Sequence, residues 1–94
     1  MDKGLVTGKT ATGFEFTVKK NMLQNAEFLE LFGAVQDGDS MKSFKLMEMA
    51  LGKEQKIALY DHIRDEDGMV PVDALSSEIA EIFEELGRDS EIKN

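Results

Sequence analysis

The chain has 94 residues, and its 19 Asp and Glu against 11 Lys and Arg give a formal net charge of −8. Hydrophobic residues make up 41% and charged residues 32%, which is typical of a soluble globular domain with one modest core. The chain has no Cys, which excludes a disulfide scaffold, a thiolate metal site and a thiol nucleophile. The acidity argues against nucleic acid as the main partner, and no apolar run approaches the roughly 20 residues of a membrane span. We therefore expect a cytosolic protein.

The first twenty residues predict a β-hairpin. Phe14, Phe16 and Val18 alternate with polar residues, and Leu5-Val6-Thr7 is a second β-prone piece upstream. Glycines bracket the residues between the two pieces, which indicates a turn there. A two-stranded hairpin is marginal alone, so its apolar face must pack on the rest of the chain.

After the hairpin we predict four short helices, over residues 22–33, 40–51, 53–65 and 72–87. Asn21 is the expected N-cap of the first helix, Gly52 the end of the second and Gly87 the end of the fourth. The fourth helix has the clearest periodicity, because its apolar residues are spaced four, three and four apart. The predicted fold is therefore mainly α (α+β), one domain over 1–94, with a hairpin (1–20), a compact helical body (21–87) and a frayed tail (88–94).

The second predicted helix is too apolar for a simple amphipathic surface helix. Its apolar residues fall on two roughly opposite faces, with Phe44, Met47 and Leu51 on one and Leu46, Met49 and Ala50 on the other. A central helix with neighbours on both sides is the favoured interpretation. The alternative is an exposed, Met-rich patch for a partner. From this helix and a similar surplus on the first, the candidate partner-binding residues are Met41, Leu46, Met49, Ala50, Phe28 and Leu31.

The charge is distributed unevenly along the chain. Residues 1–47 hold six acidic and six basic residues, whereas residues 48–94 hold thirteen acidic and five basic residues. A solvated helix face with a polar turn is the favoured explanation, and a surface that steers a basic partner is the other.

The acidic turn Asp65-Glu66-Asp67-Gly68 invites comparison with a calcium-binding loop. With Gly68 at the loop's sixth position, the first position is Ile63 and the twelfth is Ala74, and neither can supply a carboxylate. A left-handed Gly68 in a solvated turn is the better interpretation, so we predict no metal site.

No motif organises an active site. His62 is the only histidine, and we expect it to be a half-exposed helix residue. Gly8-Lys9-Thr10 matches the end of a phosphate-binding loop, but that motif needs its first glycine five residues before the second, and Gly4 is only four before Gly8. The segment also precedes a predicted strand, whereas a phosphate-binding loop precedes a helix. We predict a non-enzyme with no catalytic residues and no cofactor.

Three segments of the chain resemble the tail assembly chaperones of long-tailed phages and prophages of Gram-positive bacteria. They are residues 51–59 (LGKEQKIAL), 62–72 (HIRDEDGMVPV) and 77–83 (SEIAEIF). The order of a short β N-terminus with a Phe14-Glu15-Phe16 strand before a compact helical body is similar too. The resemblance covers most of the chain, best from about 14 to 87, and its motifs are structural, so their specificity is moderate.

The resemblance implies a non-enzymatic role in the bacterial host cytoplasm, in a protein absent from the mature virion. Such chaperones coat the tape measure protein, keep it soluble and help to recruit tail tube subunits. Many also exist as a longer, frameshifted form. Tape measure protein and tail tube protein are thus the expected partners, with no nucleic acid and no membrane, and weak self-association stays open.

The alternative function is an acidic protein-interaction or regulatory domain whose carboxylates mimic nucleic-acid charge for a basic partner. Binding by such a mimic should collapse in salt, because exposed charges are screened. A chaperone should instead lose its client when apolar residues such as Leu46 and Met49 become polar, with little effect of salt.

Overall fold

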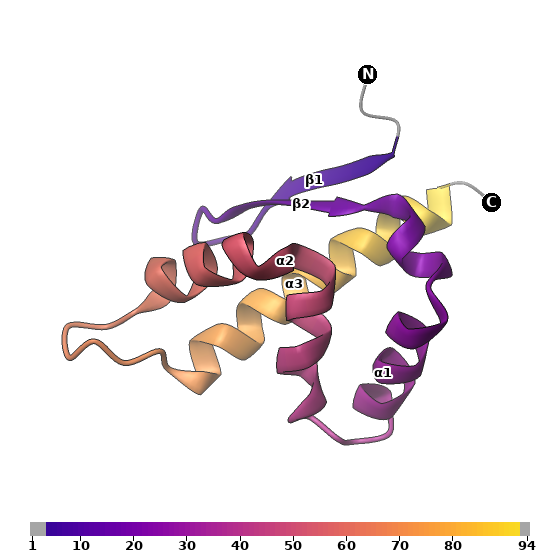
Figure 1. Cartoon of the computed structure of the whole chain (residues 1–94). Coiled ribbons are helices and arrows are strands. Elements are labelled where there is room, and N and C mark those ends of the chain that lie inside the picture. Colours follow the sequence, from indigo (N-terminus) through magenta and orange to yellow (C-terminus); the bar gives the residue numbers. More distant parts are fainter. Residues whose placement is uncertain (1–3, 93–94) are drawn as a thin grey trace.

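The computed structural model describes residues 4–92, with side chains up to residue 87. A two-stranded hairpin lies across a body of three α-helices, of which α2 is central (Figure 1). In chain order the elements are β1 (Leu5–Lys9), β2 (Glu15–Lys19), the 3₁₀ helix η1 (Lys20–Gln24), α1 (Ala26–Gln36), α2 (Lys42–Ile63) and α3 (Val72–Ile92). The mainly α fold with an N-terminal hairpin is confirmed, with three α-helices in place of about four.

The antiparallel hairpin follows from the predicted alternation. Val6 pairs with Val18, and both side chains are buried with Phe16, so one face of the hairpin joins the core. Gly8 lies opposite Phe16, and a Cβ on Gly8 would stand 2.7 Å from the Cζ of that ring. The glycine therefore lets the Phe16 ring cross from β2 onto β1.

The start of the first helix differs from the prediction. Residues 20–24 form one turn of 3₁₀ helix, and α1 begins after Asn25, whose side-chain oxygen accepts a hydrogen bond from the Glu27 backbone amide at 2.9 Å. Asn25, and not Asn21, is thus the N-cap, because its backbone is extended and its oxygen reaches the second helical amide. Gly33 is tolerated inside α1, which continues to Gln36.

The predicted boundary between the second and third helices is a sharp kink inside α2 (Figure 1). Gly52 has φ 84° and ψ 165°, a conformation essentially restricted to glycine. Two side-chain interactions span the kink. The Lys56 ammonium lies 3.1 Å from the Glu48 carboxylate, and the Gln55 amide donates to the Leu51 carbonyl at 2.8 Å.

The first half of α2 is sandwiched, as the favoured interpretation of its two apolar faces predicted. Leu46, Met47, Ala50 and Leu51 are all buried, and α2 packs against α1, α3 and β2. The two apolar faces therefore serve two sides of one core.

The apolar stripe of the last helix is confirmed, but its predicted end is wrong. The stripe residues Leu75, Ile79, Ile82 and Leu86 are buried. The helix passes Gly87 and continues to Ile92, so residues 88–92 are helical where a frayed tail was predicted; residues 93–94 lie outside the described part. A glycine inside a helix costs about 1 kcal/mol, which neighbouring good helix formers offset.

Candidate functional site

An apolar groove opens between α1 and α3. Its volume is about 370 Å³, and its lining consists of Leu23, Phe28, Leu29, Phe32, Phe83, Leu86 and Gly87. Each lining residue is apolar or glycine, and the groove is open because α1 packs mainly on α2. We call this feature the α1–α3 groove and treat it as the candidate binding site.

Three aromatic rings form a rigid wall of the groove. Phe28 and Phe32 stack with their centroids 6.4 Å apart, one helical turn from each other on α1. Phe83 of α3 meets both edge-on, at 6.0 and 6.3 Å. Such edge-to-face pairs are favourable, so the aromatic wall holds its shape without a ligand.

The floor and rim of the groove give it access to solvent. Gly87 has no side chain, and a Cβ built on it would meet nothing within 4 Å, so the floor at this point is open space. On the rim, the Leu29 side chain is 48% exposed. The groove therefore presents apolar surface that the described side chains leave uncovered.

The two helices that form the groove are strongly acidic. The sequence of α1 carries two acidic residues and no basic one, and that of α3 carries seven acidic residues and one basic one, Arg88. Glu84 is exposed, follows Phe83 in the sequence and precedes Gly87 by one helical turn. Glu78 and Glu81 of the same helix instead bond the hairpin turn, so Glu84 is the exposed acidic residue that lies one turn from the groove residue Gly87.

The structure separates the candidate partner-binding residues. Phe28 lies at the inner wall of the α1–α3 groove, while Met49 and Ala50 line another hollow at the kink, of about 360 Å³, beside Met22. Met41 is 70% exposed at the start of α2.

Part of the proposed patch is wrong as a surface. Leu46 is 0% exposed, Ala50 and Phe28 are also buried, and Leu31 is half-buried against the core. Leu46 and Ala50 are covered because α2 has neighbours on both faces, and Phe28 and Leu31 because α1 packs on α2 and the core. Leu29, Phe32, Phe83 and Gly87 were missed, since their meeting depends on how α1 and α3 cross. The only indication of this groove in the sequence was the surplus of apolar residues on the first predicted helix.

A polar cluster holds the hairpin turn against α2 and α3. Thr12 donates its hydroxyl proton to the Glu78 carboxylate at 2.6 Å, and its oxygen lies 2.9 Å from Nε2 of His62. The Ala11 amide donates to the Glu81 carboxylate at 2.7 Å. Because the Thr12 proton is used by Glu78, His62 donates from Nε2. The cluster ties the turn down and presents no free nucleophile.

Two members of this cluster differ in burial. Glu78 is 2% exposed, and its Oε1 has no hydrogen-bond partner among the described residues. His62 is an exposed residue of α2, and its ring also contacts Phe14, with centroids 5.6 Å apart. Its structural role is therefore contact with the hairpin, which the sequence did not indicate.

The acidic turn after α2 is closed by its own backbone. The Asp65 carboxylate accepts from the Asp67 and Met69 amides, both at 2.9 Å, and the Arg64 guanidinium donates to the Gly68 carbonyl at 2.8 Å. Gly68 has φ 82°, which confirms its predicted left-handed conformation. Within residues 4–92, no three or more potential metal-ligating side chains come together as a group.

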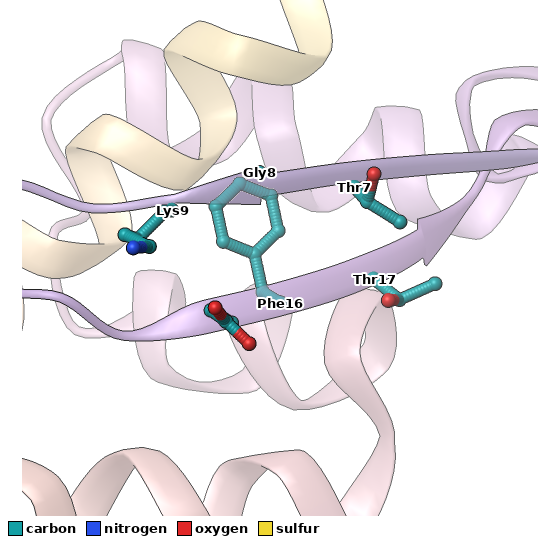
Figure 2. Close-up of a pocket in the computed structure, with 6 residues that line it drawn as sticks. Thr7, Gly8, Lys9, Phe16 and Thr17 are labelled. Carbon is teal, nitrogen blue, oxygen red and sulfur yellow. The ribbon is translucent and has the colours of Figure 1, made fainter.

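A wide, shallow hollow of about 590 Å³ lies over the hairpin (Figure 2). Figure 2 shows the Phe16 ring reaching from β2 toward Gly8 on β1, with Thr7 and Thr17 to one side and Lys9 to the other. Lys9 pairs with Glu15 across the two strands. The outer edge of β2 is closed by Gln55, whose amide accepts from the Thr17 N–H at 2.9 Å and donates to its carbonyl at 2.8 Å. This hollow is polar and shallow, so the α1–α3 groove is the stronger candidate for protein binding.

Comparison of the chain with models of protein families, with curated proteins and with solved structures finds no match. Among the described residues, no helix is both long and apolar enough to span a membrane.

Proposed function

We propose that this protein is a non-enzymatic phage tail assembly chaperone, which binds and solubilises the tape measure protein and helps to recruit tail tube subunits. The observation that carries the proposal is the α1–α3 groove, an open apolar surface on an acidic protein. The resemblance of segments 51–59, 62–72 and 77–83 to these chaperones supplies the identity of the client. The proposed site of action is the bacterial host cytoplasm, with the protein absent from the finished virion.

The physical requirements of such a chaperone support the proposal. A protein that keeps a long helical client in solution needs apolar surface for the client and a charged exterior that resists aggregation. The chain has both, since the groove is lined by apolar residues and the net charge is −8. Binding of this kind needs no catalytic group.

Co-expression with the tape measure protein tests the function. We expect the soluble fraction of the tape measure protein to rise several-fold when this chain is present, and we expect the two proteins to purify together. A matched co-expression with an unrelated acidic protein of similar size controls for a general effect of charge. No gain in soluble tape measure protein over that control would contradict the proposal.

A second candidate function is an acidic domain that binds a basic partner by charge mimicry. The observation that favours it is the excess of thirteen acidic over five basic residues in 48–94. The two functions differ in their response to salt. A charge mimic should lose its partner completely as salt is raised, whereas client binding in an apolar groove should fall only to the level set by its apolar contacts.

A further inference from the structure

The geometry and charge of the α1–α3 groove point to one kind of occupant, an amphipathic α-helix of a partner protein with Lys or Arg residues flanking its apolar stripe. This inference rests on the proposed chaperone function and names the chemistry of the client segment. It also identifies the groove as the surface that receives this segment.

The apolar lining calls for large apolar side chains from the partner. A side chain inserted over Gly87 would meet the half-buried rings of Phe32 and Phe83, whose centroids are 6.3 Å apart and which are backed by the buried ring of Phe28. Its entry would also cover Leu29, which is half exposed without a partner. Burial of such apolar surface stabilises a complex and offsets part of the cost of association.

The groove favours a helix over an extended strand. Its walls are helices whose backbone groups bond within each helix, so they offer no ladder of N–H and C=O groups to a strand. A partner segment buried there must satisfy its own backbone, which a helix does. The anchors of such a helix would be apolar side chains at i, i+3 or i+4, which lie on one helix face.

The charge of the two helices predicts which residues flank the apolar stripe of the partner helix. The exposed acidic residues of the two helices are Glu27 and Glu30 on α1 and Asp73 and Glu84 on α3, and neither helix has a basic residue among its described side chains. Glu84 is exposed and lies one turn from Gly87, so it stands on the α3 side of the groove. Basic flanks on the partner are attracted to such walls, and acidic flanks are repelled.

Three synthetic peptides test the chemistry. They share one Leu stripe at helical spacing and differ only in flanking residues, which are Lys, Gln or Glu. Measured by fluorescence anisotropy with the full chain at low salt, the Lys peptide should bind about tenfold or more tighter than the Glu peptide. That advantage should vanish in 1 M NaCl, where the Debye length is about 3 Å. Equal affinities for the Lys and Glu peptides at low salt would overturn the charge assignment.

One substitution tests the location without removing a core contact. Gly87→Leu places a side chain in open space on the groove floor, and it replaces the poorest helix former other than Pro by a good one. We expect this variant to be at least as stable as the wild type and to bind the Lys peptide at least tenfold more weakly. Gly33→Leu is the matched control, since Gly33 is also helical, meets open space and does not line the groove.

Two readouts separate this inference from the chaperone function. If wild type and Gly87→Leu solubilise the tape measure protein equally well, the function stands and the groove is the wrong surface. If the wild type gives no gain in solubility but binds the Lys peptide in the groove, the function fails and the groove assignment survives. Peptide-induced NMR shifts at the hairpin or at Met49, with none at Phe32 and Phe83, would also overturn the assignment.

Discussion

The Thr12 hydroxyl joins the hairpin to two helices, and it donates a hydrogen bond to the buried Glu78 carboxylate. Thr12→Val keeps the shape of the side chain and removes this bond. A buried acceptor left without its donor costs roughly 1–3 kcal/mol, so we expect the free energy of unfolding to fall by that amount in urea titrations. Thr7→Val, at an exposed strand position, is the control. A Thr12→Val variant as stable as this control would show that the bond contributes nothing.

Lys56 predicts a dependence on alkaline pH. The hydrogen bond that the Lys56 ammonium donates to the Glu48 carboxylate raises the pKa of Lys56 above its ordinary 10.5. The charges of Glu48 and Tyr60 act in the same direction, and partial desolvation opposes the shift. A raised pKa means that the folded state holds the proton more tightly, so the stabilisation is complete below pH 10.5 and is lost as pH rises through the folded-state pKa.

The comparison of wild type with Lys56→Gln measures this effect. The difference in their free energies of unfolding should be present at pH 8 and should shrink as pH rises above 10.5. Lys53→Gln, at an exposed position next to the kink, is the control for the loss of one positive charge. A difference that stays constant across this pH range would contradict the assigned role of the Glu48–Lys56 contact.

At the scale of elements, the kink in α2 depends on Gly52. Its φ of 84° is strained for an L side chain, although a Cβ there would meet nothing within 4 Å. Gly52→Ala should therefore lower the free energy of unfolding by roughly 1–3 kcal/mol through backbone strain alone. Gly33→Ala, inside α1, should instead raise it by up to about 1 kcal/mol. Urea unfolding of the two variants measures both changes in the free energy of unfolding. Equal changes for the two variants would show that the positive φ at Gly52 is not required.

At the scale of the whole molecule, the sandwiching of α2 determines what remains on the surface. Because α2 supplies Leu46, Met47 and Ala50 to the core, the methionine-rich patch predicted on it is largely unavailable to a partner. The groove instead arises where α1 and α3, both packed against α2, leave space beside Phe32 and Gly87. The surface proposed to bind the client is therefore a property of the helix arrangement and of no single helix.

The sequence by itself determined the features that depend on local periodicity and on backbone chemistry. Alternation at Phe14, Phe16 and Val18 predicted the hairpin, and the 4-3-4 spacing on the last helix predicted its buried stripe. Gly52 and Gly68 were placed correctly because only glycine readily adopts a positive φ. Helix ends were less predictable, since Gly87 and Gly33 are tolerated inside helices that tertiary packing stabilises.

Only the tertiary structure decided which apolar residues are covered and which polar residues meet. The pattern of the predicted helix over 40–51 favoured a central helix but was also compatible with an exposed patch, because a helix sequence records its apolar faces but not its neighbours. Likewise, Thr12 contacts His62 and Glu78, which lie 50 and 66 residues further along the chain, and no local pattern indicates these contacts. The α1–α3 groove depends on the same long-range packing, since its lining comes from helices separated by all of α2.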